Sequence, residues 1–422
     1  MTPEALASWD CAVPRYTSYP TVPAWGSVTS EDVNAALQRC RPGAHVYVHL
    51  PFCEQQCSYC GCTMVQTRQR GIGELYLDTL ERRLDALPLP EGRVPMARLH
   101  LGGGTPTWFN EDQLARLHAM VLRRFAPTPN ASLSLEADPE ATSVGQLERL
   151  AELGFTRLSL GVQSTDERVL RAVDRPQSER RLDVLIQAAR GLGYKLNLDL
   201  MLGLPHQDYT SVLRTLMRVK AWRPDRIALF SYAHMPHLKR NQKRIDGSAL
   251  PNAIERARTA IEARNYLVER GWVPIGMDHF ALPTDDLATG TVRRNFMGYY
   301  PAADADLVGL GMSSISCVDG LFFQQAPKLM DWMRDAAPVR GWQMTEDDHR
   351  RGEVIEALMC GGSAVVPSDL LTAALPELQS LIDGGLASVD CNTVKVLEPL
   401  LSRLVAATFD SYRTAGRFSQ AV

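Results

Sequence analysis

Six apolar segments, each followed by a helical pattern, constrain the fold of this 422-residue chain more than any other feature. The segments are rich in aliphatic and β-branched residues and are typical of buried strands. Strands are expected at residues 46–50, 97–101, 131–135, 157–160, 195–202 and 226–230. Strands that alternate with helices pair in parallel, with the helices packed outside them. The sequence therefore predicts an α/β fold, a partial parallel (βα)6 barrel of the TIM type.

Polar or glycine-rich residues follow every one of the expected strands. The segments concerned are residues 53–62, 102–107, 136–139, 161–164, 203–205 and 231–234. In parallel βα folds the carboxyl ends of the strands build the active site. We therefore expect the six segments to meet at one rim.

The first of these segments carries Cys53, Cys57 and Cys60 in the spacing CxxxCxxC. Thiolates are the usual ligands of iron–sulfur clusters, and three of them leave one iron of a [4Fe-4S] cube open. A zinc site would need a second pair of cysteines, and none follows at a matching spacing. Cys62 is a candidate fourth ligand, but its position two residues after Cys60 is awkward for the same cube. We expect Cys62 near the cluster without binding it.

Composition indicates in which compartment the protein works and which classes of partner it does not bind. The formal net charge of −3 and the pI of about 6.3 argue against a nucleic-acid partner or a charged membrane surface. Four of the nine cysteines lie within residues 53–62, unlike the dispersed pairs of a disulfide framework. No apolar run is long enough for a membrane span, and the start of the chain does not resemble a signal peptide. We expect a cytoplasmic, monomeric protein.

The pattern along the chain divides it into three parts. An extended arm is expected over residues 1–35, and the barrel with a C-terminal extension over residues 36–340. A small, mainly helical domain is expected over residues 341–422, with helices at 350–359, 370–382 and 397–414.

Motifs spread over the whole chain resemble one family. They are PRYTSYPT at residues 14–21, YVHLPFC at 47–53, CGC at 60–62, GGGTPT at 102–107, GMDHF at 276–280 and RFS at 417–419. Together they resemble the radical S-adenosylmethionine (radical SAM) superfamily and, within it, the oxygen-independent coproporphyrinogen III dehydrogenase family.

The resemblance implies a cofactor and a reaction. Cys53, Cys57 and Cys60 would bind a [4Fe-4S] cluster whose open iron is chelated by SAM. A 5'-deoxyadenosyl radical would then drive the decarboxylation of two propionate side chains of coproporphyrinogen III to vinyl groups, giving protoporphyrinogen IX. The resemblance also implies a low-potential electron donor such as a flavodoxin or ferredoxin.

The same resemblance assigns contacts with one or two SAM molecules to eleven positions. These are Tyr47, Tyr59, Gly103, Gly104, Thr105, Glu136, Gln163, Arg175, Asp199, Ala233 and Ile315, of which Tyr47 is grouped with the three cysteines as catalytic. Asp199 alternates with leucines on its strand and should face the barrel interior, where an unpaired carboxylate is costly, and this favours a ligand. The glycines at 102–104 have two interpretations: they allow a ligand to approach the backbone closely, or they only form a tight turn.

Several polar residues outside this set are candidates for the substrate side. His279, Arg15 and Tyr16 could line the substrate pocket, as could Arg240, Lys243 and Arg244. Solvated surface charge explains the cations equally well.

Three positions depart from the family pattern. Met297 stands where the family usually has glutamine near a second SAM molecule, Met64 replaces a lysine, and Cys360-Gly361-Gly362 replaces a more polar motif. Two alternatives follow. One is a paralogous radical SAM enzyme, such as a methyltransferase, that acts on another tetrapyrrole. The other is a heme-binding chaperone, although that relative typically lacks the fourth cysteine and the arm motif, and both are present here.

Overall fold

The structure is a computed structural model that describes residues 1–301, 304–413 and 418–421. Of the expected features, Thr414 at the end of the last helix and Arg417 of the RFS motif lie outside these residues. Within the described ranges, no helix combines the length and the hydropathy that a membrane span requires.

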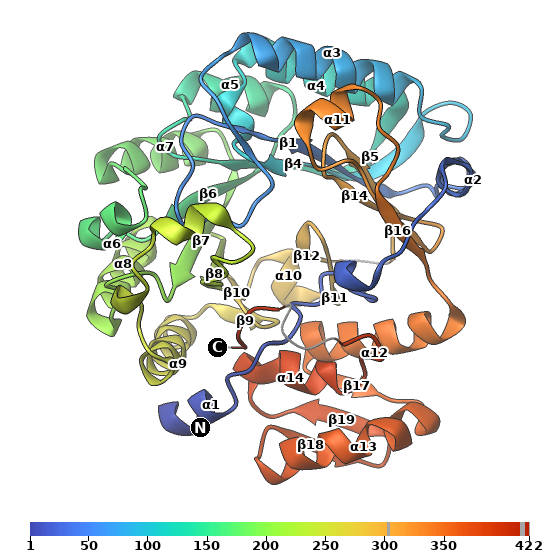
Figure 1. Cartoon of the computed structure of the whole chain (residues 1–422). Helices are drawn as coiled ribbons and strands as arrows, with labels where there is room; N and C mark the ends of the chain where they lie inside the picture. Colours follow the sequence, from blue (N-terminus) through green and yellow to red (C-terminus); the bar gives the residue numbers. More distant parts are fainter. Residues whose placement is uncertain (302–303, 414–417, 422) are drawn as a thin grey trace.

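A twelve-stranded sheet forms the centre of the molecule (Figure 1). Its parallel middle consists of β1 (Ala44–Leu50), β4 (Val94–Gly103), β5 (Phe125–Ala137), β6 (Arg157–Gln163), β7 (Lys195–Leu202) and β8 (Arg226–Ser231). These are the six strands predicted from the sequence, and the predicted α/β fold class is confirmed.

Further strands extend the sheet at both ends. Beside β1 lie β13 (Leu307–Leu310), β14 (Ile315–Val318), β15 (Leu321–Gln324) and β16 (Arg340–Gln343), and beside β8 lie β10 (His279–Ala281) and β9 (Val273–Ile275). Of these strands, β13 pairs with β1 in parallel, and all the other pairings are antiparallel. Because β16 and β9 are the two ends of the sheet and do not pair with each other, the barrel is partial, as predicted.

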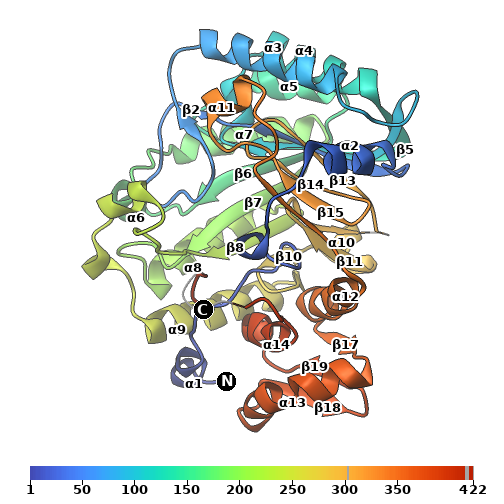
Figure 2. The same ribbon diagram turned by 45° about the vertical axis from the view of Figure 1, so that its right-hand side comes forward.

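Helices cover the outer face of the parallel strands (Figures 1 and 2). They are α3 (Gly71–Asp85), α4 (Glu111–Arg124), α5 (Val144–Glu152), α6 (Glu167–Ala172), α7 (Glu179–Gly191), α8 (Tyr209–Trp222) and α9 (Ala253–Glu269). Each of α4, α5, α8 and α9 starts with a capping box. On α3, Leu77, Leu80 and Leu84 form a buried stripe at three and four spacing.

The inner face of the sheet is polar. Every second residue of β7 is an aliphatic side chain buried beneath the helices, whereas Asn197 and Asp199 lie on the opposite, inner face. Asp199 pairs with Ala228 of β8, which in turn pairs with His279 of β10. Paired residues share a face, so Asp199 and His279 both face the barrel interior.

The C-terminal part combines helices with a small sheet. The helices are α12 (Glu346–Gly361), α13 (Ser368–Asp383) and α14 (Ser402–Ala407), and the antiparallel strands are β17 (Ser363–Val365), β18 (Ala387–Asp390) and β19 (Thr393–Val396). The first two predicted helices are confirmed. The helix predicted over 397–414 is wrong in extent, because within the described residues 397–413 only a 3-10 turn at Pro399–Leu401 and α14 form. Since residue 341 lies inside β16, we propose that the C-terminal unit begins at α12.

The N-terminal arm differs from the predicted extended segment. It contains α1 (Pro3–Ser8) and α2 (Ser30–Gln38), both capped by a threonine side chain. Arm residues share a buried apolar core with the C-terminal unit, and those most deeply buried are Leu6, Val13, Tyr16 and Tyr19. The first part of the arm, up to Tyr19, is therefore part of the C-terminal core, whereas Val33 of α2 packs in the core of the barrel.

The remaining short elements connect these parts. They are β2 (Phe52–Cys53), β3 (Val65–Gln66), α10 (Asp286–Thr289), β11 (Val292–Asn295), β12 (Gly298–Pro301), α11 (Leu329–Met333) and 3-10 turns at Val22–Ala24, Pro106–Trp108, Arg240–Arg244 and Gly247–Ala249.

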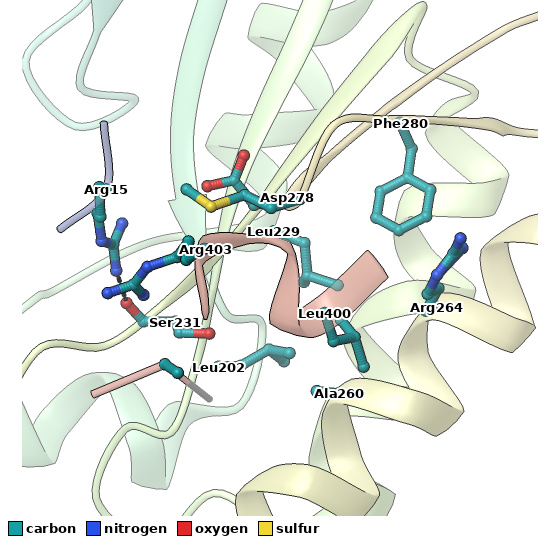
Figure 3. Close-up of a pocket in the computed structure, with 12 residues that line it drawn as sticks. Arg15, Leu202, Leu229, Ser231, Ala260, Arg264, Asp278, Phe280, Leu400 and Arg403 are labelled. Carbon is teal, nitrogen blue, oxygen red and sulfur yellow. Dashed lines mark hydrogen bonds between the residues drawn. The ribbon is translucent and has the colours of Figure 1, made fainter. Parts of the chain in front are cut away.

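Arg403 of α14, drawn near Arg15 in Figure 3, fastens the arm to the C-terminal tail. Its guanidinium, only 3% exposed, donates at 3.0 Å to the carbonyl oxygens of Pro14 in the arm and Ser419 in the tail. Arg15 lies in the same pocket and donates at 2.6 Å to the carbonyl of Ser231 at the end of β8. One side chain thus joins the two termini beside the barrel.

Replacing Arg403 with methionine should lower the free energy of unfolding by about 3 kcal/mol, because several buried carbonyl oxygens lose their donors. Chemical denaturation measures this, and limited proteolysis should show faster cleavage within the first 20 residues. The control Arg149→Met removes an exposed pair with Glu152 and should leave both measurements unchanged. Equal stability of the two variants would contradict the role given to Arg403.

Candidate active site

Three cysteines lie in the loop between β1 and β3. Cys53 ends β2, which pairs with β3, and Cys57 and Cys60 follow in the loop between these two short strands. All three side chains are half-buried. Among the described residues, no three metal-binding side chains converge on a single ion position. In a [4Fe-4S] cube each cysteine would bind a different iron, so the three side chains need not converge on one ion position.

The surroundings of the cysteines suit a cluster. Burial raises the pKa of Cys53 to about 12, and burial also raises the pKa of Cys57 although Arg175 opposes the effect. Such thiols become thiolates beside a metal, because a coordinating metal removes the proton. Cys62 is exposed, and its hydrogen bond with Cys60 lowers the pKa of the Cys60 thiol.

A distant segment holds the cluster loop by its carbonyl groups. The Asn241 side-chain amide lies 3.2, 3.0 and 2.9 Å from the carbonyl oxygens of Cys57, Ser58 and Cys60. The buried Gln242 amide donates to the Tyr59 carbonyl at 3.1 Å. Together with Arg244, these side chains reach every carbonyl from residue 56 to residue 60.

The glycine turn after β4 packs directly on the chain that leads into this loop. Gly103 has φ +113°, and a Cβ there would lie 2.6 Å from the His49 ring. A Cβ on Gly104 would lie 2.6 Å from the Pro51 carbonyl oxygen. The Gly104 amide donates to the Leu50 carbonyl at 2.8 Å. The close packing of this turn on the end of β1 and on Pro51 is therefore sufficient to require glycine at both positions, whether or not a ligand binds there.

Thr105 completes this turn. Its hydroxyl oxygen lies 3.2 Å from the Cys53 sulfur, and its amide donates to the Phe52 carbonyl at 2.9 Å. A hydrogen bond thus links the turn directly to the first cysteine.

Tyr47 lies on the inner face of β1 in a fixed orientation. His49 Nε2 is 2.8 Å from the Thr63 carbonyl and must donate to it, so Nδ1 accepts the Tyr47 hydroxyl proton at 3.0 Å. The Tyr47 ring stacks on His100 of β4 at 6.0 Å between centroids. This network turns the Tyr47 hydroxyl toward His49.

Glu136 ends β5 beside the glycine turn. One carboxylate oxygen accepts the Gly103 amide at 3.2 Å, and the other lies 3.5 Å from His100 Nε2. Burial alone would raise the pKa of Glu136, but His100 and the Gly103 amide hold it below its usual value. Glu136 is therefore a carboxylate at neutral pH.

Arg175 and Gln163 bring unpartnered polar atoms to the same rim. Arg175 is 7% exposed, and its guanidinium lies 3.2 Å from Asp138 Oδ2 and 3.4 Å from the Cys57 sulfur. Arg175 Nε, Gln163 Oε1 and Asn197 Oδ1 are buried without a hydrogen-bond partner. Because buried polar atoms are rarely left unpaired, these groups fit a polar ligand such as SAM.

Asp199 lies deeper on the inner face. Its carboxylate accepts from the Ser159 hydroxyl at 2.8 Å and from the Asn197 amide at 2.7 Å. Burial, with Glu136 as a second cause, raises the pKa of Asp199 to about 6. This buried carboxylate is therefore close to its titration point near neutral pH.

The other three expected SAM positions lie around this rim. Tyr59 packs on an apolar cluster that includes Val169 and Leu204. The Ala233 carbonyl accepts the Gln242 amide at 3.1 Å. Ile315 begins β14, and its carbonyl lies so close to Gly309 that a Cβ there would be 2.4 Å away.

Two substrate-side candidates are already engaged elsewhere. The Tyr16 hydroxyl donates to Asp410 at 3.0 Å, and Arg244 donates to the Gln56 carbonyl at 2.8 Å. His279 does face the barrel interior, and its Nδ1 lies 2.7 Å from Asp278.

The three departures from the family pattern lie in different surroundings. Met297 sits in the turn between β11 and β12, where its amide donates to the Asn295 side chain at 2.8 Å. Met64 is half-buried just before β3. Gly362 ends α12 in the left-handed conformation, with φ +67°. This conformation favours glycine and explains the residue at this position.

Sequence analysis missed Asp138, the two histidines that orient Tyr47 and Glu136, and Asn241. His49 could have been found, because it lies two residues from Tyr47 and so shares the same strand face. Asn241 carried no signal, because its contacts are to backbone groups 181 to 184 residues away.

Comparison with known proteins agrees with this geometry. Residues 47–219 match the family model described as Radical SAM superfamily. The oxygen-independent coproporphyrinogen III oxidases of Escherichia coli and Bradyrhizobium diazoefficiens are 35% and 34% identical to this chain, over 98% and 96% of it and 97% and 96% of their own lengths. The solved structure of coproporphyrinogen III oxidase (HemN) from Escherichia coli superposes with a TM-score of 0.90 at 34% identity, covering 94% of this chain and 98% of that one.

Membership of the radical SAM superfamily implies a [4Fe-4S] cluster and SAM as cofactors. Full-length similarity at this level extends through the arm and the C-terminal unit as well as the barrel. The chain therefore belongs to the oxygen-independent coproporphyrinogen III oxidase family of radical SAM enzymes.

Proposed function

We propose that this enzyme converts coproporphyrinogen III to protoporphyrinogen IX without oxygen, by oxidative decarboxylation of two propionate side chains. The observation that carries the proposal is the direct contact of the glycine turn with the three-cysteine loop, through Thr105 and Cys53, at the rim of a polar barrel interior. The family of the chain supports the substrate, since its relatives bear the name of this reaction.

Cys53, Cys57 and Cys60 would hold the cluster, and SAM would occupy the space bordered by the glycine turn, Glu136 and the unpartnered atoms of Gln163 and Arg175. When bound, the cluster and SAM would together supply the radical chemistry that removes a hydrogen atom from a substrate propionate. Glu136 would hold an ammonium group or ribose hydroxyls, and Arg175 a carboxylate. Tyr59, Ala233 and Ile315 would line the edges of the same space, and Tyr47 would face its floor.

The setting that we propose for the enzyme is cytoplasmic and monomeric. Each of the two decarboxylations would require one electron from a low-potential carrier such as a flavodoxin or ferredoxin. Met297 offers no amide to a second SAM molecule, so a second SAM would bind more weakly than the first.

Incubation of the reconstituted protein with coproporphyrinogen III, SAM and dithionite under anaerobic conditions should yield the monovinyl and divinyl products, detected by mass spectrometry. Cys57→Ala should abolish both products and SAM cleavage, because the cluster loses one of only three ligands. SAM cleavage with a methylated tetrapyrrole, or tight heme binding with no product, would favour the methyltransferase or the heme chaperone instead.

SAM affinity should weaken as the pH falls through about 6, because protonation of Asp199 removes the charge that binds SAM. At pH 5 the apparent Kd should be about tenfold above its plateau. Asp199→Asn should bind weakly with no step near this pH, and Ser159→Ala should move the midpoint upward because it removes a hydrogen bond to the carboxylate. Equilibrium dialysis across pH 5 to 8 measures this; a flat profile for the unmodified enzyme would exclude Asp199 from the SAM site.

Equilibrium dialysis at saturating SAM should show one tight site per chain. Met297→Gln should strengthen the second site by about tenfold, because a bidentate amide contributes on the order of 1 to 2 kcal/mol. Two sites of equal affinity in the unmodified enzyme would contradict the effect ascribed to Met297.

A further inference from the structure

The segment that holds the cluster loop presents an unpaired positive surface to solvent. Arg240 and Lys243 are exposed and Lys239 is half-buried, and none of the three has an ion-pair partner among the described residues. Arg244 is also exposed, and among the described residues it pairs with Asp174 alone, at 3.6 Å. The four cations occupy six residues of a chain whose formal net charge is −3.

These cations are fixed against the cluster loop by their neighbours. Asn241 and Gln242 donate to the carbonyls of residues 57–60, and Arg244 donates to the Gln56 carbonyl. The backbone of the segment is therefore bonded to the loop that carries Cys57 and Cys60. A protein seated on this segment would therefore lie next to the cluster loop.

An apolar side chain lies among the charges. Leu238 is 59% exposed and directly precedes Lys239. An exposed apolar side chain next to a group of like charges is a feature of transient protein interfaces, in which charge sets the association rate and direction.

From these observations we infer that residues 238–244 form the docking surface for the electron donor, and that this donor is an acidic one-electron carrier protein. The inference rests on the cluster in the proposed function. Within the docked complex, one electron passes from the reduced carrier to the cluster. The carrier is oxidised by one electron, the cluster is reduced by one electron, and no bond forms or breaks.

The test uses charge reversal at the two exposed cations that make no contact with the loop. Arg240→Glu/Lys243→Glu is compared with Lys220→Glu/Arg223→Glu, an equal change in net charge at exposed residues where α8 ends, at the opposite rim of the barrel. Stopped-flow absorbance follows reduction of the reconstituted cluster by the hydroquinone form of an acidic flavodoxin, at low and high ionic strength. Dithionite serves as a reductant that needs no docking.

At low ionic strength the flavodoxin should reduce the 240/243 variant at least about tenfold more slowly than the unmodified enzyme, and salt should slow the variant less. The 220/223 variant should stay within about twofold of the unmodified enzyme, because its charges lie where α8 ends, at the rim of the barrel opposite the cluster loop. Dithionite should reduce all three equally.

Equal rates with flavodoxin for all three proteins would overturn the docking surface while leaving the proposed function intact. A raised KM for coproporphyrinogen III in the 240/243 variant, with dithionite as reductant, would also overturn it by assigning these cations to the substrate. Failure of dithionite to reduce the unmodified protein would instead remove the cluster on which both proposals depend.

Discussion

The contact between the glycine turn and the chain entering the cluster loop is the constraint on which the site depends. Gly104 donates to the Leu50 carbonyl, and Thr105 bonds both the Phe52 carbonyl and the Cys53 sulfur. No side chain fits at Gly103 or Gly104, because His49 and Pro51 occupy the space. The ends of β1 and β4 thus form one rigid piece, so the cysteine loop and the proposed SAM site cannot move independently.

The rest of the site is arranged around this piece by the strand register. One inner row joins Tyr47 of β1 to His100 of β4, and another joins Asp199 of β7 to His279 of β10 through Ala228. Burying a polar side chain without a hydrogen-bond partner costs free energy. Here most of the inner-face polar side chains hydrogen-bond to one another, and some buried polar atoms have no partner among the described residues. A barrel interior of this kind is built to hold a polar ligand.

The fold could be predicted because the strands carry strong local patterns. All six central strands lie where the alternation with helices placed them, since aliphatic residues beneath the helices dominate each one. The arm and the last helix were predicted less well. Tyr16 and Tyr19 are held by a core that forms only with α12 to α14, and residues 397–401 pack as a turn against that core, which no local pattern reveals.

The site was predictable in part for a similar reason. Motifs such as the cysteine loop carry their chemistry within a few residues, and the resemblance supplied the separate SAM positions. Asn241 and Asp138 act through contacts with remote segments, namely the cluster-loop carbonyls and Arg175. The exposed cations at 240 and 243 acquire a meaning only when the fold places them against the cysteines.

The central claim is a three-cysteine cluster with one open iron that binds SAM. Mössbauer spectroscopy of protein reconstituted with 57Fe, before and after addition of SAM, tests this claim most directly. The account predicts four irons per chain and a change at a single iron when SAM is added, because only one iron lacks a cysteine ligand. Four equivalent irons that do not respond to SAM, or a single metal ion per chain, would contradict it.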